Sequence, residues 1–166
     1  MNKKTLKPML AGVFAAGAFG GITLGIAWAT PGLGISTTIL AGPALLGEIN
    51  VHSKSKTNDV KIKTKGLSQV YTVYNRIVPG GNTGWHSHPG PSIITVKSGQ
   101  ATEYDGDDPN RTPVVHPAGT SFVDDGQHAH LIRNEGSTDL ELVAFQILPA
   151  GAPRRIDEPR PPQYDF

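Results

Sequence analysis

Short runs of β-branched and aromatic residues, separated by turns, dominate the chain from Leu67 to Leu148. Turn signals such as Pro79-Gly80-Gly81, Pro117-Ala-Gly119 and Asp124 to Gly126 separate these runs at short intervals. The 166-residue chain contains 20 Gly and 14 Pro and has no long run of helix formers after residue 30. Eight or more short strands at such spacing predict an all-β fold, either a barrel or a jelly roll.

Two histidine pairs of the form His-x-His lie within this strand-rich region. His86 and His88 follow a glycine-rich turn, and His128 and His130 come later in the chain. Residues i and i+2 of a strand point to the same face, so the two imidazoles of a pair would project side by side. Neutral imidazoles on one face can bind a divalent metal ion. The alternative is that they are buried or turn residues of a barrel that holds no metal.

The sequence around these pairs resembles the two motifs of the cupin family. The matching positions are Gly80, His86, His88 and Gly99 for the first motif, and Pro117, Gly119, His130 and Asn134 for the second. The resemblance covers about residues 67–148 and implies a cupin-type jelly-roll β-barrel, or double-stranded β-helix. It also implies that His86, His88 and His130 are metal ligands. The phrase Gly84-Trp-His-Ser-His-Pro-Gly-Pro further resembles a group of exported bacterial cupins.

Gly119 and His130 are separated by ten residues where the family usually has two, and a second departure affects the ligand set. Ser92 stands where cupins carry a glutamate ligand, and a serine hydroxyl at most holds a water molecule beside the ion. His128 has the strand parity of His130 and could supply a fourth nitrogen, unless a bulge next to Gly126 turns it away. Apolar residues of inward parity would wall the pocket, namely Ile94, Val96 and Ile132.

The donor set limits the metal and its ligand. The chain has no cysteine, so no thiolate can bind the ion. Nitrogen ligands suit Zn, Fe, Ni, Co or Cu better than Mg or Ca. Three neutral imidazoles leave the charge of the ion uncompensated, so an anionic small molecule would be attracted to the open positions.

The N-terminus predicts export. Lys3, Lys4 and Lys7 precede an apolar run of 21 residues, Met9 to Ala29, which ends in an A-x-A cleavage site before Thr30. The run is also long enough to span a bilayer, so an uncleaved membrane anchor is the alternative. Both readings place the remaining chain in the periplasm or outside the cell, with membrane contact only through this segment.

Four segments follow from these patterns. Residues 1–29 form the signal peptide or anchor, residues 30–66 an N-terminal extension, residues 67–148 the barrel, and residues 149–166 a proline-rich tail. In the extension, Ile35 to Leu40 predicts a strand that Gly42-Pro43 ends, and Val60 to Lys63 an edge strand. The tail either lies extended on the barrel or is disordered.

Two further patterns concern partners. Removal of residues 1–29 would change the formal charge from +1 to −2, because it takes away three of 15 basic residues and none of 14 acidic ones. This weak balance offers no basic face for nucleic acid. Leu140 to Leu148 is apolar on both faces, which indicates a buried strand or a subunit interface and makes a homodimer a hypothesis.

Together these features predict an exported metal-binding cupin that coordinates a small anionic molecule. As an enzyme it would use the metal for dioxygenase, isomerase or lyase chemistry. The sequence offers no clear general base beside the ligands. A non-catalytic small-molecule-binding or sensor cupin, with or without metal, is therefore the alternative, and the sequence leaves enzymatic activity open.

Overall fold

The computed structural model describes residues 29–166 of the chain. The export signal predicted for residues 1–29 therefore lies, apart from Ala29, outside the described residues. Between residues 29 and 166 no helix has the length and hydropathy needed to cross a membrane.

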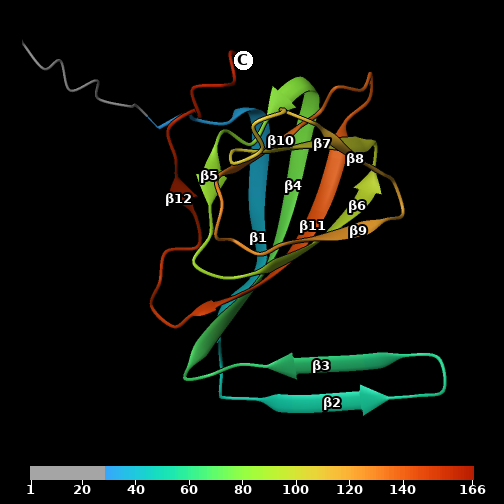
Figure 1. The fold of residues 1–166 in the computed structure, drawn as a ribbon, viewed down its shortest axis with the longest axis vertical. Coiled ribbons are helices and arrows are strands. Elements are labelled where there is room, and N and C mark those ends of the chain that lie inside the picture. Colours follow the sequence, from blue (N-terminus) through green and yellow to red (C-terminus); the bar gives the residue numbers. More distant parts are fainter. Residues whose placement is uncertain (1–28) are drawn as a thin grey trace, which may run out of the picture.

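Strands account for the regular structure of the described residues, which confirms the all-β prediction (Figure 1). In chain order they are β1 (Leu33–Leu46), β2 (Asn50–Lys54), β3 (Asp59–Lys63), β4 (Ser68–Asn82), β5 (His86–Ser87), β6 (Ser92–Ser98), β7 (Gln100–Asp105), β8 (Val114–Pro117), β9 (Ser121–Asp124), β10 (His130–Arg133), β11 (Leu140–Pro149) and β12 (Ile156–Asp157).

The barrel consists of two antiparallel layers that face each other. One layer has the order β1-β4-β11-β6-β9, and the other has the order β12-β5-β10-β7-β8. A bridge between Arg133 and Asn82 links the layers through β10 and β4. The result is a nearly closed barrel of the cupin jelly-roll type, in which inward side chains from both layers converge.

Alternation along the strands builds the core. In β6 the inward residues Ser92, Ile94 and Val96 are buried, whereas Ile93 between them is half exposed. The same alternation in β11 fills the interior with leucines. The core cluster comprises Val73, Ile77, Ile94, Val96, Ala101, Ile132, Leu140, Leu142 and Ala144.

The outer face of β11 is not buried, which contradicts one of the two alternatives for Leu140 to Leu148, a strand buried on both faces. Phe145 on that face is 40% exposed, and Val143 is only partly buried. β11 lies between β4 and β6 in its sheet, but within the described residues the outer face of that sheet is not fully covered. The second alternative, a subunit interface, stays a prediction.

The N-terminal extension has a longer first strand than predicted, and it contains a hairpin. β1 does not end at Gly42-Pro43 but continues along β4 to Leu46, with register irregularities between Ile39 and Ala44. Such irregularities absorb a proline and a glycine of positive φ without ending the pairing. The strand β3 predicted at Val60 to Lys63 pairs with β2 in a separate hairpin outside the barrel (Figure 1).

The proline-rich tail lies on the barrel. Its strand β12 pairs with β5, in the register Ile156 to Ser87 and Asp157 to His86. Further along, Tyr164 is buried against Trp85, with a ring-centroid separation of 4.7 Å. Of the two states that the sequence left open for this segment, the structure shows the ordered one.

Candidate metal centre

A tight turn brings His86 into the barrel. Gly84 has a φ of +69°, a conformation that favours glycine, and its carbonyl oxygen accepts a hydrogen bond of 2.9 Å from Nδ1 of His86. Trp85 points to the opposite side, where it is fully buried against Tyr164. The alternation at β5 therefore separates the imidazole from the large aromatic ring.

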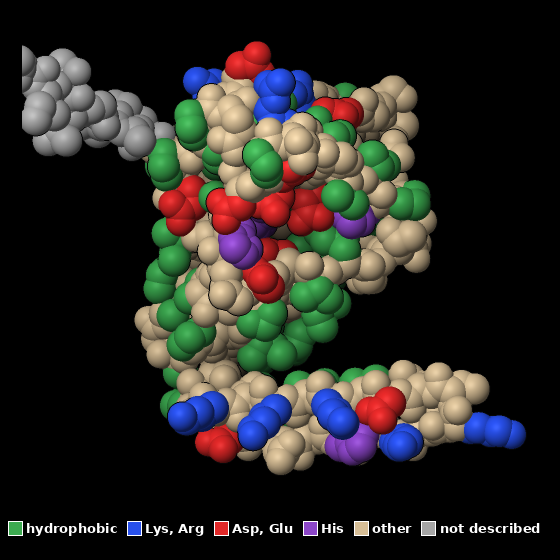
Figure 2. Space-filling model, in the orientation of Figure 1, with side chains coloured by type: hydrophobic (Ala, Val, Ile, Leu, Met, Phe, Trp, Pro, Cys, Tyr) green, Lys and Arg blue, Asp and Glu red, His purple; other side chains and the backbone are tan. Residues whose placement is uncertain are grey.

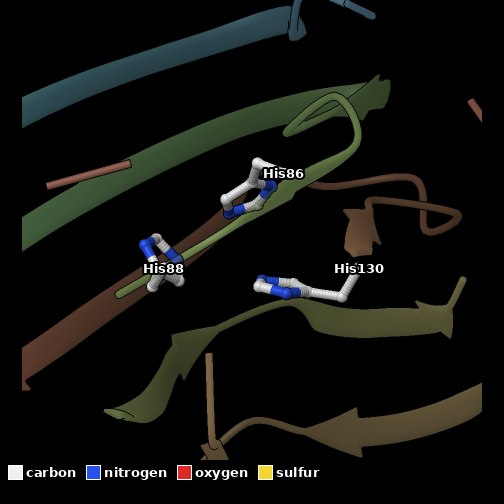
Figure 3. Close-up of side chains that lie close together, drawn as sticks. All are labelled: His86, His88 and His130. Atoms are coloured by element: carbon white, nitrogen blue, oxygen red, sulfur yellow. The ribbon is translucent and has the colours of Figure 1, made fainter. Parts of the chain in front are cut away.

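Three imidazoles converge in the interior (Figure 3). His130 on β10 is the register partner of His86 on β5, and His88 follows on the same side. Among the described residues, His86, His88 and His130 form a buried group whose possible ligand atoms all lie within 4.8 Å of one another. Residues far apart in the sequence thus meet because β5 and β10 are neighbouring strands of one layer.

Backbone carbonyls fix the orientation of two of the rings. Nδ1 of His88 hydrogen-bonds the carbonyl oxygen of Arg154 at 2.8 Å, as Nδ1 of His86 does with Gly84. A carbonyl only accepts hydrogen bonds, so each Nδ1 carries the proton and each Nε2 keeps a free lone pair. The second nitrogen of these rings is therefore available to a metal ion.

Burial keeps these imidazoles neutral. It lowers the pKa of His86 well below its usual value, and the positive charge of a protonated His130 lowers it further. Burial also lowers the pKa of His88 to about 4, against an opposing effect of the Arg154 carbonyl. Both rings thus have the unprotonated form that metal ligation requires at neutral pH.

His128 does not join this group. Its side chain is 52% exposed, and its Nδ1 lies 2.5 Å from a carboxylate oxygen of Asp107. β10 begins only at His130, so strand parity does not extend back to His128, and the preceding turn contains Gly126 at a φ of +84°. The structure thus turns this imidazole to the surface, as the alternative of a bulge allowed.

A cavity of about 280 Å³ opens beside the histidines. Ser92, Ile94 and Ile132 line it, whereas Val96 is fully buried in the core and does not line the cavity. Gln146 donates a hydrogen bond of 3.0 Å to the hydroxyl of Ser92. The lining is therefore mixed, with apolar side chains beside polar groups that include the imidazoles, Ser92 and Gln146.

The tail contributes two cations to the cavity. Arg154 and Arg155 both line it, and Nε of Arg155 lies 2.5 Å from Oδ1 of Asp157. Among the described residues, Arg154 has no carboxylate within ion-pair distance. Its guanidinium is therefore a free positive charge at a partly buried position.

Comparison with known proteins agrees with the fold. A family profile described as a cupin domain matches residues 73–146. The chain belongs to the cupin superfamily.

Several solved structures are similar to this chain at low sequence identity. A cupin-2 domain protein from Rhodospirillum rubrum is 12% identical with a TM-score of 0.51, covering 77% of this chain and 68% of that chain. A cupin superfamily protein from Desulfitobacterium hafniense is 11% identical with a TM-score of 0.46, covering 69% and 77% of the two chains. A predicted oxalate decarboxylase from Thermotoga maritima is 27% identical with a TM-score of 0.41, covering 51% and 83%. No match is found among curated proteins.

A buried carboxylate that sequence reasoning missed lies beside the histidines of this cupin. Asp124 ends β9, is 8% exposed, and is the register partner of Ser92 on β6. Its Oδ2 lies 3.7 Å from Nε2 of His88, and its Oδ1 lies 3.6 Å from Nδ1 of His130. In the sequence it belongs to a turn signal, and only the pairing of β9 with β6 reveals its position.

The residues present fit a divalent transition metal. Among the described residues, Nε2 of His130 and Oδ2 of Asp124 are buried without a hydrogen-bond partner, which is unfavourable unless a cation pairs with them. Atoms bonded to one ion at about 2.1 Å lie at most about 4.2 Å apart. The imidazoles, within 4.8 Å of one another, would need to approach only slightly to share an ion.

Proposed function

We propose that this cupin is an exported protein that binds one of the divalent ions of Zn, Fe, Ni, Co or Cu and coordinates a small anionic molecule there. His86, His88 and His130 would hold the ion through nitrogen atoms. When bound, such an ion supplies a Lewis acid for an oxygen of the coordinated molecule. The surrounding residues bind and orient that molecule in the cavity.

The convergence of three buried imidazoles carries this proposal. Buried histidines that serve only packing would use both ring nitrogens in hydrogen bonds, because an unpaired buried polar atom is costly. Here Nε2 of His130 has no hydrogen-bond partner among the described residues. Two neighbouring rings are held by carbonyls through Nδ1 alone, which leaves their other nitrogens for a common ligand.

The charge around the cavity supports an anionic ligand. Arg154 lines the cavity without a carboxylate partner among the described residues. A partly buried guanidinium of this kind gains most from a carboxylate or phosphate that reaches it from the cavity. A volume of about 280 Å³ suits a molecule of few atoms.

A non-catalytic role as a binding or sensor protein is a second candidate. Among the described residues that line the cavity, Asp157 provides the carboxylate, and Nε of Arg155 donates to it at 2.5 Å. A general base must be free and within hydrogen-bond reach of the substrate. The lining therefore favours ligand capture over proton transfer, and dioxygenase, isomerase or lyase activity would depend on the ion.

Metal analysis of paired histidine variants tests the proposed site. The protein would be purified without a histidine tag, and its bound metals measured by mass spectrometry. We expect the wild type and His128→Ala to retain metal. In His86→Ala the affinity for the metal should fall more than about 100-fold, because residues that only orient the ligands already change metal affinity 10- to 100-fold. Equal metal content in His86→Ala and the wild type would refute the proposal.

A further inference from the structure

We propose that Asp124 supplies the carboxylate of the metal centre from β9, in place of the glutamate that cupins carry at the position of Ser92. The inference rests on the proposed metal-binding function. Ser92 and Asp124 face each other in the antiparallel pair β6–β9. Opposite residues of such a pair project to the same face, so a carboxylate on either strand reaches the same part of the interior.

Asp124 lies outside the group of three histidines whose possible ligand atoms are within 4.8 Å of one another, but its carboxylate is near two of them. The separations of 3.7 Å from Oδ2 to Nε2 of His88 and 3.6 Å from Oδ1 to Nδ1 of His130 are too long for good hydrogen bonds. The first separation, to an Nε2 that is free to ligate, lies within the span of about 4.2 Å that two ligands of one ion can have. Oδ2 has no hydrogen-bond partner among residues 29–166.

The backbone fastens this carboxylate to the segment that carries His88. Oδ1 of Asp124 accepts a hydrogen bond of 2.9 Å from the amide of Gly126. The carbonyl of Gly126 in turn accepts a hydrogen bond of 3.1 Å from the amide of His88. One carboxylate oxygen is thus used to hold the turn, and the other is left facing the histidines.

A second cavity of about 270 Å³ lies next to this carboxylate. Asp124 and His130 line it together with Glu103, Asp105 and Asp125. Figure 2 shows acidic side chains gathered on the visible face of the barrel. Acidic walls raise the local concentration of cations, so this cavity is suited to admit the ion, whereas the cavity beside Arg154 suits an anion.

Zinc affinity of the full-length wild type and four variants tests the role of Asp124. Asp124→Asn keeps the oxygen that accepts from Gly126, and the control Asp165→Asn changes an exposed carboxylate of the tail that lines neither cavity. We expect Asp124→Asn to weaken Zn²⁺ binding about 10- to 100-fold in competition with a chromophoric chelator. We expect Asp165→Asn to bind like the wild type.

Relocation of the carboxylate provides the decisive comparison. In the double variant Ser92→Glu/Asp124→Asn, we expect roughly tenfold or greater recovery of the lost affinity, because the carboxylate returns from the opposite strand. With a chelator present, Asp124→Asn should unfold at the same or a higher temperature than the wild type, since a buried charge without a partner is removed.

Three results would overturn the inference. Wild-type zinc affinity in Asp124→Asn, alongside lost affinity in His86→Ala, would reject Asp124 and leave the metal-binding function standing. Lower chelator-treated stability in Asp124→Asn without rescue by the double variant would assign the carboxylate a structural role. Absence of zinc binding by the wild type would reject this inference and, if no other transition metal binds, the proposed function with it.

Discussion

Arg154 acts at the site through two separate groups. Its carbonyl oxygen accepts the hydrogen bond from Nδ1 of His88, and the residue also lines the cavity. Its positive charge contributes to the lowered pKa of His88, and burial together with Arg155 lowers the pKa of its own guanidinium. The backbone of this residue therefore orients a candidate ligand, while the side chain provides charge for a bound anion.

Replacement of Arg154 by Gln should separate these two contributions. The backbone carbonyl stays, so metal content should not change. Affinity of the metal-loaded protein for malonate, a small dicarboxylate probe, should fall about 10- to 100-fold, since a hydrogen bond to a charged group contributes about 1.5–3 kcal/mol. Isothermal titration calorimetry would measure this, with Arg160→Gln as a control that removes an exposed charge from the same tail.

For single residues of the site, the sequence predicts the histidines His86 and His88 but not the carboxylate of Asp124. His86 and His88 lie two residues apart, and their common side follows from local alternation. The position of Asp124 depends on the register of β9 against β6, which no local pattern specifies. Local alternation gives the wrong side for His128, because alternation predicts side-chain direction only inside a strand and β10 begins at His130.

The sequence predicts the strands of the barrel from the turns between them, but it does not predict the position of the tail. Alternation and turn residues predict β4, β6 and β11, whose inner faces form the core. β12 has two residues and no periodicity that a sequence pattern could reveal. Its position results from pairing with β5 and from the burial of Tyr164, both of which are contacts between distant segments.

The tail depends on Tyr164 for its attachment. The ring is 2% exposed and packs against Trp85, and the hydroxyl donates a hydrogen bond of 2.9 Å to the carbonyl of Asp105. Tyr164→Ala should lower the free energy of unfolding by about 3–5 kcal/mol, as other large aromatic truncations do. Tyr164→Phe should cost about 1 kcal/mol, because only the hydrogen bond is lost.

Urea unfolding of both variants, with and without zinc, measures these costs. Zinc affinity should fall further in Tyr164→Ala than in Tyr164→Phe, because the tail also holds the carbonyl that orients His88. Phe166→Ala serves as a control, since that ring is 42% exposed in the same segment. Equal stability losses for Tyr164→Ala and Phe166→Ala would show that the tail is not anchored at Tyr164.

For the whole molecule, the buried imidazoles link stability to pH. The pKa of His88 is about 4 in the folded protein, against a usual value near 6.5 in an unfolded chain. Between these values the unfolded state binds a proton that the folded state does not, so stability falls as pH decreases. His86, with a pKa also lowered well below its usual value, acts in the same direction.

The metal-free protein should therefore become less stable from about pH 6.5 down to about pH 4, by on the order of 3 kcal/mol from His88 alone. The raised pKa of the exposed His128, caused by its hydrogen bond to Asp107, acts in the opposite direction but is screened by solvent. Urea unfolding at several pH values in the presence of a chelator would give the slope. His88→Gln should flatten it, because Gln keeps a hydrogen-bonding group without the titration. If His88→Gln keeps the wild-type slope, the pH dependence arises from other groups, and burial does not lower the pKa of His88 in the folded protein.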